Sequence, residues 1–196
     1  MNLKAQNLSK HYNFQWVFKD IQFNLNTGDS LSVLGANGSG KSTLLQVIYG
    51  LVEPNSGKIL IDDSEVFVEN KVFSYTSPAL LLPTEFTIGE LHSYYLQLNK
   101  LSISLDDFLN RLELEKKQWK KPIKYFSSGQ LQKLKTALCL FSVSPILLLD
   151  EPLTNMDKKG ETWFDNIVKE IQLNKILIFA GNTDSETKWS KQLIQL

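Results

Sequence analysis

Short apolar segments separated by turn residues fill the first third of the chain. They cover residues 3–8, 17–25 and 30–34. Apolar runs of this length, bounded by turn residues such as Gly28-Asp29, predict strands, and we expect these three to pair antiparallel. A further strand pair is expected at roughly 58–62 and 65–68, after the turn Asn55-Ser56-Gly57.

A helical period replaces this pattern in much of the remaining chain. Apolar residues three or four positions apart predict helices. The segments with this spacing are 42–51, 87–98, 105–115, 130–141 and 158–173. Asp157 is placed to cap the last of these helices.

Two uninterrupted apolar runs, Ile146–Leu149 and Ile176–Phe179, have the length of a strand and no polar face. Such runs are typical of parallel strands that are buried on both faces. The order of elements predicts an α/β fold, with a mostly parallel core, an antiparallel N-terminal sheet and an inserted α-helical subdomain. Within one domain over 1–196, we place the core at 1–77 and 129–196 and the helical subdomain at about 78–128.

The charges balance, with 21 Lys plus Arg and 21 Asp plus Glu in 196 residues, so we predict no nucleic-acid partner. The local basic run from Lys116 to Lys124 could meet an acidic partner or lipid headgroups, although a solvated helix face is the commoner meaning. The single cysteine, Cys139, lies in an apolar helical pattern and is expected to be a buried, inert thiol.

No apolar run approaches the ~18 residues that a membrane span needs. The first eight residues also lack the apolar segment of a secretory signal. We therefore expect a cytoplasmic protein that reaches the inner face of the cell membrane only through a partner.

The clearest motif lies between a predicted strand and a predicted helix, and it matches the phosphate-binding pattern G-x-x-x-x-G-K-[ST]. Glycines let backbone N–H groups turn toward anionic oxygens, and the helix N-terminus adds its positive dipole end. Lys41 is expected to reach the β- and γ-phosphates of ATP, and Ser42 to ligate Mg²⁺. The predicted nucleotide site comprises Gly35, Ala36, Asn37, Gly38, Ser39, Gly40, Lys41, Ser42 and Thr43.

Two adjacent carboxylates, Asp150 and Glu151, follow the run Ile146–Leu149. At the C-terminal end of a buried strand, Asp150 is expected to hold Mg²⁺ through water. Since side chains alternate along an extended chain, Glu151 is expected to point elsewhere and to act as the general base on the attacking water.

Two further segments give the chain a family resemblance. The segment Phe126-Ser127-Ser128-Gly129-Gln130 resembles the signature Leu-Ser-Gly-Gly-Gln of the ABC ATPases, and Thr154-Asn155-Met156-Asp157 looks like their D-loop. The resemblance covers the whole chain. It implies a P-loop NTPase fold and a head-to-tail homodimer or heterodimer, in which one subunit's P-loop and the other's signature hold each ATP.

The physical position of the signature agrees with this role. Ser127 and Gly129 lie where the helix 130–141 begins, so that hydroxyl, backbone N–H and helix dipole would face an anion. Ser127 and Ser128 could also simply cap that helix, and both roles need the same geometry. Ser128 fits in place of glycine if its φ is negative.

The resemblance also implies an aromatic side chain stacked on adenine. Tyr12 occupies the expected position, and Phe14 and Trp16 are near enough to be alternatives.

Two positions depart from the family pattern. No glutamine lies at the Q-loop, where Ser77 or Pro78 stands, and Asn182 replaces the switch histidine after the strand Ile176–Phe179. An amide can hydrogen-bond a γ-phosphate but carries no proton or charge for it. With Lys41 and Glu151 as catalytic residues beside Asn182, we predict slow ATP hydrolysis.

The leading hypothesis is therefore the ATPase subunit of an ABC transporter, paired with a separate membrane permease. The compact size resembles small exporter-type ATPases, including those of cytochrome c biogenesis. The alternative is a poorly hydrolysing module that dimerises on ATP. A set of apolar residues in the helical subdomain is expected either to dock the membrane partner or to fill the subdomain's own core: Phe86, Ile88, Leu91, Tyr94 and Tyr95.

Overall fold

The computed structural model describes residues 1–65, 72–98, 100, 101, 103–181 and 188–196. Its described strands form two sheets. The first is antiparallel and has the order β2-β1-β4-β5. Its strands are β1 (Asn2–Tyr12), β2 (Gln15–Asn26), β4 (Ser56–Ile61) and β5 (Ser64–Glu65).

The second sheet is parallel throughout, with the order β6-β7-β8-β3-β9. Its strands are β3 (Ser30–Leu34), β6 (Phe73–Thr76), β7 (Ile146–Asp150), β8 (Ile176–Gly181) and β9 (Gln192–Gln195). This arrangement confirms the predicted α/β fold with an antiparallel N-terminal part.

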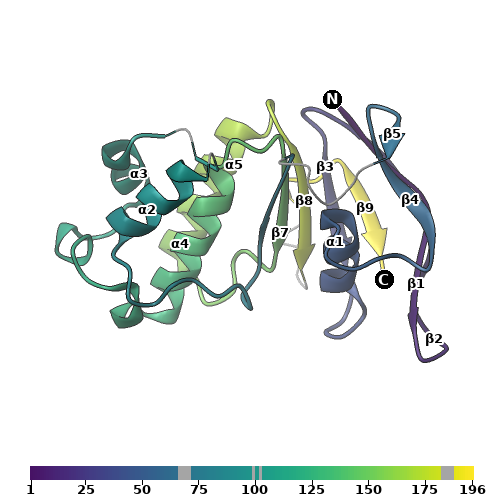
Figure 1. Cartoon of the computed structure of the whole chain (residues 1–196), viewed down its shortest axis with the longest axis horizontal. Helices are drawn as coiled ribbons and strands as arrows, with labels where there is room; N and C mark the ends of the chain where they lie inside the picture. The colour runs from purple at the N-terminus through teal and green to yellow at the C-terminus, as the bar shows by residue number, and fades with distance from the viewer. Residues whose placement is uncertain (66–71, 99, 102, 182–187) are drawn as a thin grey trace.

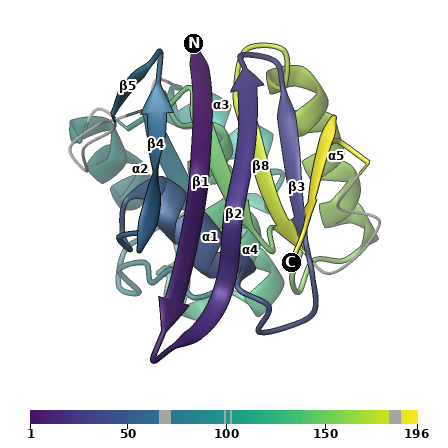
Figure 2. The ribbon, with the colours of Figure 1, turned by 90° about the vertical axis from the view of Figure 1, so that its right-hand side faces the viewer.

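Helices cover both faces of the parallel sheet (Figure 1). The helices are α1 (Lys41–Tyr49), α2 (Ile88–Gln97), α3 (Leu105–Leu112), α4 (Ser128–Leu140) and α5 (Lys158–Ile171), with 3₁₀ turns at Lys116–Gln118 and Ile123–Tyr125. Helix α1 lies between the two sheets, where its apolar side chains share one core with β1, β2 and β3 (Figure 2). Helices α4 and α5 pack on the other face of the parallel sheet in a second core that α2 and α3 extend.

The third N-terminal strand pairs differently from the prediction. We expected the segment 30–34 to continue the antiparallel sheet, but β3 runs parallel between β8 and β9. The physical reason is burial: four of its five residues are buried, as in a central parallel strand. Strands β6 and β9 were not predicted at all, because each is short and interrupted by polar residues.

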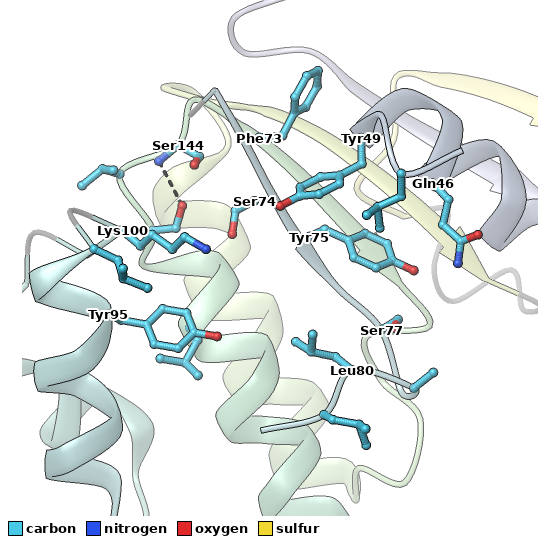
Figure 3. A pocket seen from close by; sticks show the side chains of 17 residues that line it. Gln46, Tyr49, Phe73, Ser74, Tyr75, Ser77, Leu80, Tyr95, Lys100 and Ser144 are labelled. Carbon is cyan, nitrogen blue, oxygen red and sulfur yellow. Dashed lines mark hydrogen bonds between the residues drawn. The ribbon is translucent and has the colours of Figure 1, made fainter. Parts of the chain in front are cut away.

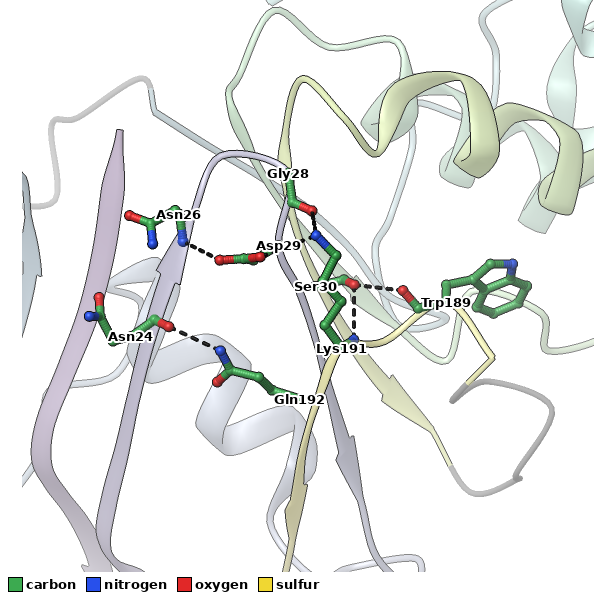
Figure 4. A network of polar contacts seen from close by, with 8 residues as sticks. All are labelled: Asn24, Asn26, Gly28, Asp29, Ser30, Trp189, Lys191 and Gln192. Atoms are coloured by element: carbon green, nitrogen blue, oxygen red, sulfur yellow. Dashed lines mark hydrogen bonds and ion pairs between the residues drawn. The ribbon is translucent and has the colours of Figure 1, made fainter.

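The last strand supports the start of the phosphate-binding segment. Lys191, just before β9, donates its ammonium to the Gly28 carbonyl (2.7 Å) and the Asp29 carboxylate (3.3 Å), as Figure 4 shows. At the other end of β9, the Leu196 backbone N–H donates to the Leu34 carbonyl at 2.8 Å. Strand β9 therefore fixes β3 along its whole length, and β3 ends at the segment where the phosphate motif begins.

Candidate functional site

The phosphate motif forms the turn between β3 and α1. Gly38 and Gly40 adopt left-handed backbone conformations, with φ of 82° and 106°, which favour glycine. A Cβ at Gly40 would lie 2.2 Å from a methyl group of Val17, so the turn is closed on one side by β2. The sequence did not single out Val17, because its contact with Gly40 joins two separate elements.

The N-terminus of α1 is open to an anion. Gly40 is its N-cap and no side chain accepts from the first turn, which also lacks acidic residues. The backbone N–H groups of that turn therefore have no intrahelical partner and carry the positive end of the helix dipole. Lys41 is buried, and its ammonium donates to the carbonyls of Gly35 (2.8 Å) and Ala36 (3.0 Å). A cation and a set of free N–H groups thus converge on one turn.

Asp150 ends β7 directly beside this turn. The Tyr75 hydroxyl donates to its Oδ2 at 3.2 Å, while its Oδ1 is buried with no hydrogen-bond partner among the described residues. Burial raises the pKa of Asp150, and the Ser42 hydroxyl, the Tyr75 hydroxyl and the Lys41 charge act in the opposite direction. Burial also raises the pKa of Tyr75 to about 12, so its hydroxyl stays a donor.

These residues fit a Mg²⁺ ion. A buried carboxylate oxygen without a partner is costly unless a ligand satisfies it, and the Ser42 hydroxyl lies in contact with the same carboxyl group. Carboxylate and hydroxyl oxygens, completed by phosphate and water, are the donor set that Mg²⁺ prefers. No group of three His, Cys, Asp or Glu side chains among the described residues forms an all-protein metal site.

Glu151 leaves the strand by a turn that the sequence did not reveal. We expected the alternation of an extended strand to separate Asp150 from Glu151, but β7 ends at Asp150 and Glu151 is left-handed, with φ of 45°. Its N–H donates to the Ala180 carbonyl (2.8 Å), and its carboxylate accepts from the Thr154 hydroxyl (3.2 Å). The two carboxylates diverge because of this turn, and Glu151 is held at the edge of the sheet.

The signature segment forms the N-terminus of α4. Ser127 caps this helix in a capping box, accepting from the Gln130 N–H (3.3 Å) while the Gln130 side chain accepts from the Ser127 N–H (3.1 Å). Ser128 is the first helical residue and its φ is not positive, so it fits the place of a glycine. A Cβ at Gly129 would lie 2.6 Å from the Asn155 carbonyl oxygen, which explains the glycine there.

The D-loop lies against the signature, and a cavity of about 450 Å³ opens between the two segments. Asp157 caps α5, as predicted, by accepting from the Gly160 N–H at 2.8 Å. Ser127, Gly129, Asn155 and Asp157 all line the cavity. Helix N-terminus, hydroxyl and cavity together form a surface suited to an anion presented from outside the subunit.

The candidate adenine-stacking residues lie at the β1–β2 hairpin. Tyr12 pairs with Gln15 and His11 with Trp16. Because side chains alternate along β1, Tyr12 lies on the same face as Lys10 and its partner Phe18, which is buried in the core shared with α1, and Trp16 lies with His11 on the opposite face. Phe14 is at the tip, 95% exposed. The register therefore favours Tyr12 over Trp16 as the aromatic nearest the phosphate turn.

Of the two positions that depart from the family pattern, only the Q-loop position lies within the described residues. Ser77 is buried, and its side chain lies beside the Tyr75 hydroxyl. The Pro78 carbonyl accepts from the ammonium of Lys135 at 2.6 Å. Asn182 lies outside the described residues.

A groove of about 610 Å³ separates α1 and β6 from α2. Figure 3 shows Tyr49 and Tyr75 on one side of it and Tyr95, from α2, on the other. Its rim carries exposed apolar side chains, among them Leu81 at 90% exposure.

The expected docking face of the helical subdomain divides into two groups. Ile88 and Leu91 are fully buried and fill the core, so docking through them is excluded. Tyr94 is exposed, while Tyr95 and Phe86 are partly buried against the same core.

Three further expectations concern the basic run, the single cysteine and membrane-spanning helices. Lys117 pairs with Glu115 (2.5 Å) and Lys124 with Glu85 (2.6 Å), so part of the basic run is neutralised within the chain. Cys139 is buried, and burial raises the pKa of its thiol to about 12, which makes it inert as predicted. No helix within the described ranges is long and apolar enough to cross a membrane.

Comparison with known sequences gives the family. The sequence profile described as "ABC transporter" matches residues 18–154. The chain is 29% identical over 177 residues to the cytochrome c biogenesis ATP-binding export protein CcmA of Agrobacterium fabrum, covering 86% of this chain and 83% of that protein. It is 27% identical over 218 residues to the phosphonates import ATP-binding protein PhnC of Fusobacterium nucleatum, covering 99% and 88%.

Solved structures share the fold. An ATP-binding cassette solved as a dimer in a post-hydrolysis state with ADP and Pi matches with a TM-score of 0.85 at 22% identity, covering 99% of this chain and 94% of that chain. An ATP-binding subunit of an ABC transporter matches with a TM-score of 0.83 at 22% identity, covering 100% and 86%. The profile match spans more than half of the chain, so this protein belongs to the ABC transporter family and is an ATP-binding subunit that energises transport.

Proposed function

We propose that the chain binds MgATP at the turn 35–43, completes each site with the signature of a second ATPase subunit, and hydrolyses ATP slowly to drive a separate membrane permease. One observation carries the proposal: Asp150, with a buried and unpartnered Oδ1, lies beside Ser42 and the open N-terminus of α1. A free anionic oxygen and free N–H groups next to each other suit a metal ion and a phosphate chain together.

Each residue then has a defined task. The N–H groups at the uncapped start of α1 bind the phosphates, and Lys41 exchanges its two backbone carbonyls for phosphate oxygens. Ser42 and Asp150 would hold Mg²⁺, which when bound neutralises charge on the β- and γ-phosphates. Glu151 orients and deprotonates the attacking water, and its contact with the Thr154 hydroxyl holds it in place meanwhile.

The second half of each site comes from a partner subunit in this proposal. Ser127, Ser128, Gly129 and Gln130 present the capped N-terminus of α4 to the γ-phosphate across the dimer. The cavity beside the D-loop, with Asp157 in its lining, leaves room for that approach. Tyr12 stacks on adenine, on the face of the hairpin that carries Phe18.

The membrane permease docks in the groove between α1, β6 and α2 rather than on the buried face of α2. Two features of the groove support this docking: its volume of about 610 Å³ and the exposed apolar side chains along its rim, including Leu51, Leu81 and Leu98. An attachment of this kind would hold the subunit at the cytoplasmic face of the cell membrane. The alternative, a poorly hydrolysing ATP-gated dimerisation module, draws its support from Ser77 and Pro78, which stand in place of the Q-loop glutamine.

One experiment separates the two. Steady-state ATP hydrolysis and oligomeric state are measured together for wild type, Glu151→Gln and Asn182→His. We expect slow wild-type turnover, no turnover and a trapped ATP dimer for Glu151→Gln, and faster turnover for Asn182→His. Wild-type turnover that does not exceed that of Glu151→Gln, with dimerisation retained, would favour the gated module.

A further inference from the structure

Helix α4 carries three buried polar side chains on one face. Gln132, Lys135 and Thr136 are each less than 10% exposed within an otherwise apolar surface. The spacing i, i+3, i+4 places them side by side on a helix. Buried polar groups are costly without partners, so the contacts of this stripe indicate what it does.

All three side chains donate to backbone carbonyls of loops that leave the parallel sheet at its catalytic edge. Gln132 donates to the Glu151 and Pro152 carbonyls (3.5 and 3.4 Å), and Thr136 to the Pro152 carbonyl (3.4 Å). These two hold the loop after β7. Lys135 instead donates to the Pro78 carbonyl at 2.6 Å and so holds the loop after β6.

The Lys135 contact is unusual for a lysine. Lys135 is 7% exposed, and its ammonium donates to a neutral carbonyl; no ion pair joins it to a carboxylate of the described residues. A charge buried in this way is retained where a short, charge-assisted hydrogen bond fixes a backbone position. The position fixed here is the peptide that follows Ser77.

From Ser77 the contacts continue to the carboxylate beside the phosphate turn. The Ser77 side chain lies beside the Tyr75 hydroxyl, and that hydroxyl donates to Asp150 Oδ2 at 3.2 Å. The Tyr75 ring packs against Tyr49 with 5.6 Å between centroids, which restricts its movement. The second oxygen of this carboxyl group, Asp150 Oδ1, is buried without a hydrogen-bond partner among the described residues.

We propose that Lys135 is a positioning residue: it ties the signature helix α4 to the loop after β6 and, through Ser77 and Tyr75, orients Asp150 so that Oδ1 faces the metal. The proposal rests on the ATP site described above. It gives α4 a physical connection to the carboxylate of its own subunit, while its N-terminus faces the ATP of the other.

The test compares four variants by the gain in nucleotide affinity that Mg²⁺ produces, measured as the ratio of dissociation constants in EDTA and in Mg²⁺. Lys135→Met removes the tether and Tyr75→Phe removes the next link. The double variant asks whether the two are coupled. Lys175→Met is the matched control, because Lys175 likewise donates its ammonium to backbone carbonyls, those of Ser142 and Ser144 (2.7 and 2.6 Å), but at the opposite edge of the sheet.

We expect Lys135→Met and Tyr75→Phe each to reduce the Mg²⁺ gain by roughly three- to tenfold, the scale of one typical lost hydrogen bond. The double variant should lose less than the product of the single losses. Affinity in EDTA should not change, and Lys175→Met should keep the wild-type gain even where it lowers Tm. If Lys135→Met does not fold, Lys135→Gln, which shortens the side chain, carries the same expectation.

Two outcomes overturn the inference separately from the proposed function. Equal Mg²⁺ gains for Lys135→Met and Lys175→Met, or fully independent losses from Lys135 and Tyr75, would leave Lys135 a purely structural residue while the ATP site stands. If wild type shows no Mg²⁺ gain at all, the metal-assisted site itself is wrong and the positioning role falls with it.

Discussion

At the residue scale, the candidate site depends on backbone conformations that most residues avoid. Glu151 and Asn155 have φ of 45° and 62°, and neither is glycine. Such conformations cost on the order of 1 kcal/mol or more and persist where surrounding contacts hold them. At Glu151 the Ala180 carbonyl, the Thr154 hydroxyl and the side chain of Gln132 supply those contacts. The turn after β7 is therefore a built feature that separates the two carboxylates.

Gly129→Ala tests the close approach of signature and D-loop. Because the new Cβ would lie 2.6 Å from the Asn155 carbonyl oxygen, the D-loop must shift. We expect a loss of about 1–3 kcal/mol in the free energy of unfolding and weaker ATP-dependent dimerisation, measured by urea unfolding and by size-exclusion chromatography.

The matched control is Gly89→Ala, in α2, where the nearest heavy atom to a new Cβ is 3.7 Å away. Alanine should stabilise that helix by about 0.5–1 kcal/mol. Stability losses of equal size at both positions would contradict the close-approach explanation.

Asp150→Asn tests the cost of the buried carboxylate. Because burial raises the folded-state pKa of Asp150, its ionised form destabilises the nucleotide-free protein at neutral pH. The cost is relieved as pH falls through the folded-state pKa and the group takes up a proton. We expect Asp150→Asn to raise Tm without nucleotide, by roughly 2–4 °C per kcal/mol relieved.

The gain in Tm should shrink as pH falls, and the same variant should lose the Mg²⁺ gain in nucleotide affinity. Thermal unfolding at two pH values and a nucleotide titration check these points. A lower Tm for Asp150→Asn at neutral pH would show that the ionised carboxylate stabilises the fold.

At the element scale, helix ends divide into capped and open ones. Helices α2, α3, α4 and α5 begin with a side-chain cap, from Thr87, Ser104, Ser127 and Asp157 respectively. Helix α1 begins with none. The difference matches the proposed site: α1 leaves the N–H groups of its first turn for a ligand of its own subunit, whereas the cap of each other helix satisfies part of its first turn.

The carboxylate of Asp29 helps to attach β9 to β3 through its ion pair with Lys191. This carboxylate accepts from the Asn26 N–H (2.8 Å) and pairs with Lys191 (3.3 Å), and the Asn26 bond foremost lowers the pKa of Asp29 below 3.8. A lowered folded-state pKa gives stability that is present above the unfolded-state value and is lost as pH falls through the folded-state value.

We therefore expect Asp29→Asn to lower the free energy of unfolding at pH 7, by about 1 kcal/mol or less for this partly exposed group. The difference should disappear as pH falls through the lowered folded-state pKa of Asp29, measured by urea unfolding at a series of pH values. Asp63→Asn, which breaks the exposed pair with Lys4 (2.6 Å), is the control and should change stability less at pH 7. A pH-independent loss for Asp29→Asn would contradict an electrostatic origin.

At the scale of the whole molecule, the parallel sheet brings its functional segments to one edge. The phosphate turn follows β3, the Ser77–Pro78 loop follows β6, and Glu151 follows β7. Parallel strands end at the same edge of their sheet, and ligands of α/β proteins bind there. The groove beside α2 lies next to this edge and shares Tyr75 and Ser77 with it, so a partner in the groove lies close to the nucleotide site.

Leu81→Asp tests the groove as the docking surface. Leu81 is 90% exposed on the groove rim, and a buried charge there would oppose an apolar partner. We expect the variant to lose co-purification with the membrane permease by at least about tenfold. Leu173→Asp, at a similarly exposed leucine outside the groove lining, should co-purify as wild type, and nucleotide affinity reports an intact core. Equal losses for both variants would place the docking surface elsewhere.

The prediction was correct for elements whose own residues show a clear hydrophobic pattern. The apolar run of β7 and the helical stripe of α5 lie where expected. Strands β6 and β9 escaped prediction because Phe73-Ser74-Tyr75-Thr76 and Gln192-Leu193-Ile194-Gln195 mix polar and apolar residues. Such short segments become strands because a neighbouring strand offers them hydrogen bonds, which is a property of the sheet and not of the segment.

The sequence by itself determined the features that rest on residues next to one another: the glycine-rich turn before α1, the carboxylate at the end of a buried strand, and the helix caps at Ser127 and Asp157. Only the tertiary structure decided the partners of β3, the left-handed turn at Glu151 and the bond from Lys135 to Pro78, 57 residues apart. The physical reason is the range of the interaction. Turn, cap and periodicity energies depend on a few neighbouring side chains, whereas strand pairing and buried polar contacts depend on which distant segments the fold brings together.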